Sequence, residues 1–64
     1  MWELVRVTPM VPDLTVSRHE TEGEAIAAGT ETLEPVGTFL VIKHDGTVTW
    51  TNEGGDFEMV VVSA

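Results

Sequence analysis

The sequence contains no cysteine and only two serines, and these absences exclude much of the chemistry that small proteins commonly use. Without cysteine, the chain can form no disulfide bond, no thiolate metal site and no cysteine nucleophile. Ser17 and Ser63 do not stand in the glycine-flanked turn that exposes a nucleophilic serine. A chain of 64 residues without these devices must rely on a packed core, so we expect one small domain over residues 1–64 with modest stability.

Basic residues are scarce. Arg6, Arg18 and Lys43 are outnumbered by eleven acidic residues, and the formal net charge is −8. So few cations can neutralise few phosphates, and the composition therefore predicts neither direct nucleic-acid binding nor attachment to an anionic membrane. A protein partner with a basic surface would be attracted instead.

Long hydrophobic stretches are also missing. Uninterrupted apolar runs such as Met59–Val62 are far too short to cross a bilayer. The first residues, M-W-E-L-V-R, lack the basic start and the apolar run of a secretory signal. We therefore expect a soluble protein that is not secreted and acts in the cytoplasm, which would be the host cytoplasm if the protein is viral.

What the sequence does contain is strand-like. Between Gly37 and Ala64, three segments rich in Val, Thr, Phe and Trp are separated by Asp45-Gly46 and by Gly54-Gly55. Each of these pairs can adopt the positive φ angles of a tight hairpin turn. The pattern predicts an antiparallel meander of three strands.

Treating both pairs as two-residue loops fixes the register of this meander. Val41 is then opposite Trp50, and Trp50 is opposite Met59. One face of the sheet is predicted to form the core, with Phe39, Val41, Val48, Trp50, Phe57, Met59 and Val61. The other face would carry Leu40, Ile42, Thr49, Thr51, Glu58, Val60 and Val62.

The first half of the chain predicts strands and one helix. Trp2–Thr8 alternates like a strand, and residues 9–13 form a loop because they contain two prolines. Residues 14–18 either return as a short strand or remain irregular. The capping-box spacing of Thr21 and Glu24 predicts a helix over Glu22–Leu33, ended by Pro35 and Gly37.

This helix is predicted to be amphipathic. Ala25, Ile26, Gly29 and Leu33 fall on its inner side, where Gly29 would let the helix lie close to Trp50. The predicted fold is α+β with two layers: a single helix packs on one face of an antiparallel β-sheet, in the order strand, strand, helix and three strands.

No catalytic or metal-binding constellation emerges from the residue types. His19-Glu20 and His44-Asp45 are the two places where an imidazole adjoins a carboxylate, and they lie in separate connecting regions. A metal site needs three or four converging ligands. Carboxylates are abundant, but a solvated acidic surface explains them without a raised pKa. We therefore expect no enzyme activity, no cofactor and no metal.

Two surfaces are predicted as candidates for binding a partner. The first is an acidic stripe on the outer helix side, formed by Glu20, Glu24, Glu31 and Glu34. The second is an apolar strip on the helix-free sheet face, formed by Leu40, Ile42, Val60 and Val62. The alternatives are a solubilising charged face, tolerated β-branched residues on a solvated sheet, and coverage of the strip by residues 9–13.

The C-terminal half also resembles a known class of proteins. The run Gly37-Thr-Phe-Leu-Val-Ile, followed by Asp45-Gly46, Gly54-Gly55 and Phe57, resembles the C-terminal half of a group of anti-CRISPR inhibitors, which are small phage-encoded proteins. The resemblance covers about 25 residues and rests on hairpin punctuation. It implies obstruction of a host machine by surface contact, without a cofactor.

Three functional hypotheses follow. The leading one is a non-enzymatic protein-interaction protein, of phage type, that binds and inhibits a host complex. The second is a structural or cement protein of a virion or other assembly, joined through its sheet face or sheet edge and able to form a homo-oligomer. The third is an acidic mimic of nucleic acid.

Overall fold

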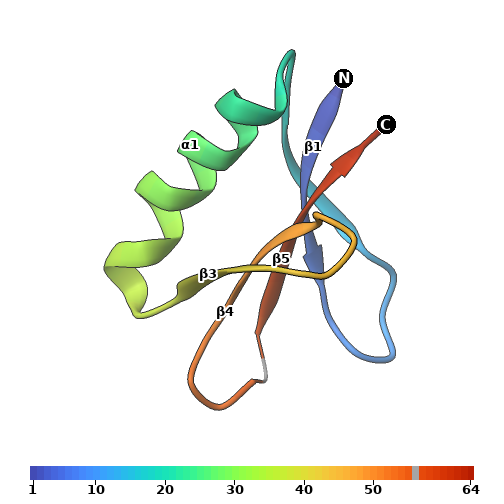
Figure 1. The fold of residues 1–64 in the computed structure, drawn as a ribbon. Coiled ribbons are helices and arrows are strands. Elements are labelled where there is room, and N and C mark those ends of the chain that lie inside the picture. The colour runs from blue at the N-terminus through green and yellow to red at the C-terminus, as the bar shows by residue number, and fades with distance from the viewer. Residues whose placement is uncertain (56) are drawn as a thin grey trace.

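A computed structural model describes residues 1–55 and 57–64. The described elements are β1 (Trp2–Val7), β2 (Leu14–His19), α1 (Glu22–Leu33), the short 3-10 helix η1 (Glu34–Val36), β3 (Phe39–Ile42), β4 (Val48–Thr51) and β5 (Glu58–Ser63). In the described residues the strands form one antiparallel sheet, and α1 lies along one face of it (Figure 1). The predicted two-layer α+β fold is confirmed.

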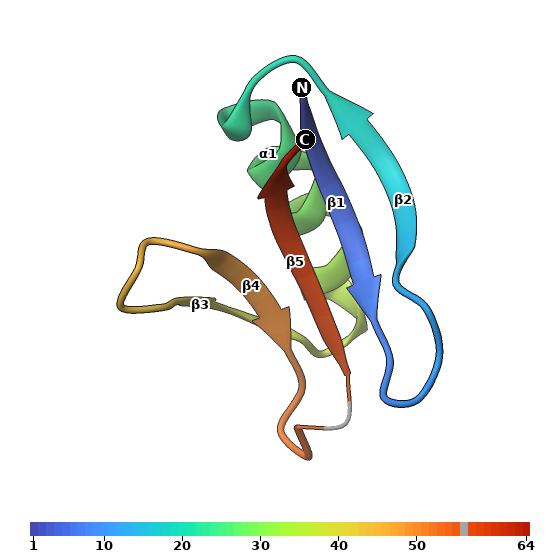
Figure 2. The ribbon, with the colours of Figure 1, turned by 90° about the vertical axis from the view of Figure 1, so that its right-hand side faces the viewer.

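The sheet has the strand order β2-β1-β5-β4-β3, so the first and last strands lie side by side at its centre. Met1 and Ala64 meet at one end of this pair, where the Ala64 N–H donates to the Met1 carbonyl at 2.8 Å. The β3–β4 hairpin diverges from the direction of β1 and β5, and α1 lies behind the sheet (Figure 2). Strands β2 and β3 are the two edges.

Residues 14–18 do form a strand, which the sequence left open. Strand β2 pairs with β1, with Leu4 opposite Ser17 and Val5 opposite Thr15. Val16 is therefore an extra residue in the ladder. It forms a β-bulge, which shifts the pairing of β2 with β1 by one residue. Beyond this strand pair, Met10 in the connecting loop has a positive φ of 66° and is fully exposed.

Helix α1 has the bounds that its capping residues predict. The Thr21 hydroxyl accepts a hydrogen bond from the Glu24 N–H at 3.1 Å, and it also lies 3.1 Å from the Glu24 carboxylate, to which it donates. At the other end, η1 carries Pro35 and stops at Gly37, whose φ of 93° is in the left-handed region that favours glycine. The helix is thus fixed at both ends by local chemistry.

The core lies between α1 and the sheet, and Trp50 is its centre. Trp50 is fully buried, and Gly29 of α1 lies directly against its indole ring. The other buried members of this cluster are Leu4, Ala25, Leu33, Val48, Met59 and Val61. The prediction that Trp50 faces the helix next to Gly29, opposite Met59, is confirmed.

The predicted register of the first hairpin is wrong by one residue. Leu40 is opposite Trp50 and Val41 is opposite Thr49, because Lys43 and Thr47 form the last pair and enclose a three-residue loop. The Gly46 N–H donates to the Lys43 carbonyl at 2.9 Å, and Gly46 has a φ of 87°. This is a type I turn followed by a left-handed glycine, rather than a two-residue turn.

The shift moves every β3 side chain to the opposite face. Leu40 and Ile42 lie on the helix side of the sheet, because they are opposite Trp50 and Val48. Phe39 and Val41, which the sequence assigned to the core, lie on the other face and are opposite Thr51 and Thr49. None of the four is buried, since β3 is an edge strand.

Candidate interaction surfaces

Exposed carboxylates line the outer side of α1. Glu24 and Glu31 are seven residues apart, about two helical turns, and Glu34 continues the helical backbone with φ −62° and ψ −39°. These three are exposed and lie opposite the buried side of α1. Glu20 is also exposed, but it precedes the extended N-cap residue Thr21, so helical spacing does not place it on this stripe.

The three basic side chains all lie on the sheet and are engaged there. Arg18 Nε is 2.8 Å from a Glu3 carboxylate oxygen, across the β1–β2 pair. Lys43 Nζ is 3.2 Å from Glu58 Oε2. The Arg6 guanidinium lies over the Phe57 ring, 5.5 Å from its centre. The basic side chains are therefore engaged by groups on or beside the sheet, away from the outer side of α1.

Among residues 1–55 and 57–64, no cation pairs with the carboxylates on the outer side of α1. The helix has no basic residue in its last turn, and within the described part of the chain none of its carboxylates forms an ion pair. Glu24 is partly engaged, because its carboxylate accepts the hydrogen bond from the Thr21 hydroxyl. Among the described residues, no side-chain hydrogen bond or ion pair involves the Glu31 or Glu34 carboxylate.

The predicted apolar strip does not exist as one surface. Leu40 and Ile42 lie on the helix side of the sheet, whereas Val60 and Val62 lie on the opposite face, since Val60 is opposite Thr49. The error follows directly from the one-residue shift in β3. In the loop of residues 9–13, Met10 and Val11 are both exposed.

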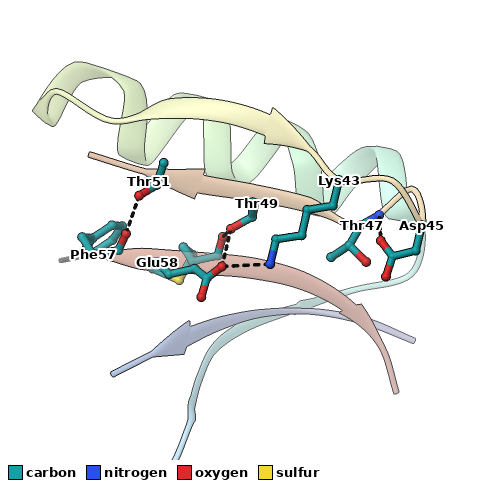
Figure 3. Close-up of polar contacts among 8 residues, drawn as sticks. Lys43, Asp45, Thr47, Thr49, Thr51, Phe57 and Glu58 are labelled. Atoms are coloured by element: carbon teal, nitrogen blue, oxygen red, sulfur yellow. Dashed lines mark hydrogen bonds and ion pairs between the residues drawn. The ribbon is translucent and has the colours of Figure 1, made fainter. Parts of the chain in front are cut away.

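The middle of the open face is polar and internally bonded. Thr49 is only 3% exposed, and its hydroxyl donates to the Met59 carbonyl at 2.9 Å. Glu58 Oε2 accepts from Lys43 Nζ at 3.2 Å and lies 3.4 Å from the Thr49 hydroxyl oxygen (Figure 3). These contacts link Lys43, which follows β3, with residues of β4 and β5. The middle of this face is therefore a polar network that holds the strands together, not an apolar surface.

Apolar side chains are exposed mainly at the sheet edges; Leu40 and Ile42 were predicted as binding candidates, but on a sheet face and not on an edge strand. On β3, Phe39 is 49% exposed, Leu40 38% and Ile42 66%. On β2, Leu14 and Val16 are exposed. Sequence patterns reveal strands readily, but they do not reveal which strand ends up at an edge.

One pair of side chains has the residue types of a catalytic dyad. The Ser17 hydroxyl and His19 Nε2 lie 2.8 Å apart on β2. A working nucleophile also needs a pocket that holds substrate and donors that stabilise an oxyanion. One surface hollow is lined by the stretch from Val41 to Asp45, which includes neither Ser17 nor His19. Ser17 and His19 are both partly buried.

Asp45 holds the turn between β3 and β4. Its carboxylate accepts a hydrogen bond from the Thr47 N–H at 2.9 Å. Hydrogen bonding from the Thr47 side chain and then from the Thr47 backbone lowers the pKa of Asp45, and the nearby Lys43 adds a smaller effect in the same direction. No group of three or more potential metal ligands occurs among the described residues.

In residues 1–55 and 57–64, no helix combines the length and the apolar character needed to cross a membrane. Comparison with protein-family models, with curated proteins and with solved structures found no match to this chain.

Proposed function

We propose that this protein is a non-enzymatic binding protein that docks the outer side of α1 onto a basic surface of a protein partner. The observation that carries this proposal is the separation of charge: the basic side chains are engaged on the sheet, while Glu24, Glu31 and Glu34 stand uncompensated on the helix. Such a surface attracts a basic partner and speeds the encounter between the two proteins.

The fold supports this role by holding α1 rigidly. Gly29 seats the helix directly on Trp50, and the Thr21 cap fixes its first turn. Carboxylates on a rigid helix lose little freedom on binding, so more of the electrostatic attraction contributes to affinity.

The action we propose is obstruction. A domain that covers the basic groove of a larger complex can inhibit it without any chemistry of its own, as the resemblance to phage-encoded inhibitors implies. If that groove normally holds DNA or RNA, the protein acts as a mimic of nucleic acid. A host cytoplasm would be the place of action.

A capture experiment with matched baits tests the proposal. The baits are the wild-type protein, the double variant Glu31→Lys/Glu34→Lys, and the control Asp13→Lys/Glu53→Lys. Both variants change the net charge equally, and all four carboxylates are exposed. Lysines near the C-terminus of α1 also suit the helix dipole, so the helix variant should fold normally.

We expect mass spectrometry of captured native-host lysate proteins to find a complex that the wild type and the control retain and the helix variant loses. Added nucleic acid should compete if the partner's groove holds DNA or RNA. Identical captures by all three baits would refute docking through α1. Recovery of virion proteins alone, by all baits, would favour the structural role instead.

A further inference from the structure

Strand β3 is an open edge of the sheet with apolar side chains on both faces. It pairs with β4 on one side only, and Phe39, Leu40 and Ile42 are all exposed. Figure 2 shows the β3–β4 hairpin diverging from the direction of β1, and among the described residues no strand lies beyond β3 in the sheet. Unpaired backbone groups along such an edge are a template for another strand.

The hydrogen bonds of the hairpin show which backbone groups are free. The Lys43 N–H donates to the Thr47 carbonyl at 2.9 Å, so these two residues form a hydrogen-bonded pair. Such pairs alternate along an antiparallel ladder, which makes Val41 and Thr49 the next one. The N–H and C=O groups of Leu40 and Ile42 must then point away from β4, towards the open edge.

The other edge is less suited to pairing. Strand β2 contains the bulge at Val16, which breaks the regular spacing of donors and acceptors. Strand β3 has an unbroken register from Phe39 to Ile42 and contains no proline. Of the two edges, β3 is therefore the one that offers a regular ladder to an incoming strand.

We infer that β3 pairs antiparallel with β3 of a second copy of this chain. The two-fold axis passes beside Val41, so Val41 is opposite its own counterpart and Leu40 is opposite Ile42 of the second copy. Leu40 and Ile42 both point backbone groups outwards, so this register joins donor to acceptor in both chains. Both residues also lie on the helix side, so apolar side chains meet on the same face.

Side-chain chemistry favours this occupant. The edge presents Leu40 and Ile42 exposed on one face, and a second copy presents the same two residues to them. Antiparallel pairing brings these apolar side chains together. The result is a continuous sheet with both α1 helices on one side, which presents the acidic surface twice.

The pairing is weak because β3 is short and each copy carries a net charge of −8. Salt screens the repulsion between two such copies and should therefore strengthen the dimer. Salt should weaken docking of α1 onto a basic partner. Salt is thus expected to change the two associations in opposite directions. A measurement can therefore refute the dimer without refuting the proposed docking of α1, and the reverse.

Sedimentation equilibrium between about 10 µM and 1 mM covers the range expected for a weak dimer. The test variant is Ile42→Lys on β3, and the control is Val16→Lys on β2. Both replace an exposed β-branched residue on an edge strand and change the charge equally. A second variant, Ile42→Pro, removes one outward N–H without removing a β3–β4 hydrogen bond.

We expect the wild type and Val16→Lys to dimerise, more tightly at high salt, and both Ile42 variants to dissociate at least tenfold more readily. Hydrogen exchange of the Leu40 and Ile42 amides should slow as wild-type concentration rises, while the Val41 amide stays protected throughout. A wild type that is monomeric at every concentration and salt would overturn the inference. So would a dimer that Val16→Lys disrupts and Ile42→Lys does not.

Discussion

Gly29 of α1 lies so close to Trp50 of β4 that a Cβ atom at Gly29 would come within 3.0 Å of three ring atoms, Cη2, Cζ2 and Cζ3. This contact sets the distance between helix and sheet. Trp50, the largest fully buried side chain, therefore packs directly against the helix that carries the acidic stripe. Stability and the proposed binding surface therefore depend on the same pair of residues.

Replacing Gly29 with alanine should destabilise the protein even though alanine favours helices. Overpacking a tight core contact typically costs about 1 to 3 kcal/mol, against a gain in helix propensity of about 1 kcal/mol. The matched control is Gly23→Ala, where the new Cβ would meet only the Thr21 hydroxyl, at 4.0 Å. Urea denaturation should show a loss of stability for the first variant and a gain for the second; the reverse order would contradict the packing.

Replacing Trp50 with alanine should cost about 3 to 5 kcal/mol, because the substitution empties the centre of the core. That loss is comparable with the whole stability of a domain this small, at about 0.05 to 0.15 kcal/mol per residue. Phe39→Ala on the exposed edge strand is the control and should change the thermal midpoint little. A Trp50→Ala variant that melts like the wild type would show that Trp50 is not the core residue.

Removing the N-cap hydroxyl in Thr21→Ala should destabilise the protein by about 1 kcal/mol, because the Glu24 N–H loses its acceptor. Thr32→Ala is a suitable control, since Thr32 is exposed in the last turn of the same helix. Chemical denaturation of both variants measures the difference. Equal stabilities would mean that the cap contributes nothing.

Acid should loosen the β3–β4 turn through Asp45. The folded state lowers the pKa of Asp45 below its ordinary value, because Thr47 hydrogen bonds favour the charged carboxylate. The stabilisation is therefore present above the unfolded pKa and is lost as the pH falls through the folded pKa.

NMR titration of the Asp45 carboxyl should place its midpoint below the ordinary aspartate value of about 3.9. Thr47→Val removes the hydroxyl, which is the largest contribution, and should raise that midpoint. A midpoint that does not move in the variant would show that the hydroxyl does not act on the carboxylate.

Much of the fold could be predicted from the sequence because local chemistry determines it. The bounds of α1 follow from Thr21, Glu24 and Pro35, and the pairing of Trp50 with Met59 follows from the period of the strands. These signals are strong because caps, prolines and alternating residues act over a few positions.

The β3 register could not be predicted because Asp45-Gly46 is compatible with two hairpins. It can fill a two-residue turn, or it can provide the last two residues of a three-residue loop that begins at His44. The choice between these hairpins depends on packing around Val48 and on hydrogen bonds of Lys43, neither of which leaves a local pattern. Because the register differs from the predicted one by one residue, Leu40 and Ile42 lie on the opposite face of the sheet from Val60 and Val62.

The acidic stripe was predicted in part, for a related reason. Glu24, Glu31 and Glu34 share a helical backbone, so their spacing places them on one side of α1. Glu20 comes before the extended N-cap residue Thr21, so helical spacing does not apply to it. The engagement of Arg6, Arg18 and Lys43 on the sheet depends on tertiary contacts, so the sequence could not show that the helix carboxylates stay uncompensated.

The measurement that tests the central claim most directly is the rate of association with the captured partner, at low and at high salt. Wild type and Asp13→Lys/Glu53→Lys should associate fast at low salt and more slowly at high salt, because screening weakens the attraction of the helix carboxylates. Glu31→Lys/Glu34→Lys should associate at least tenfold more slowly at low salt and respond little to salt. An association rate that neither the helix reversal nor salt changes would contradict docking through α1.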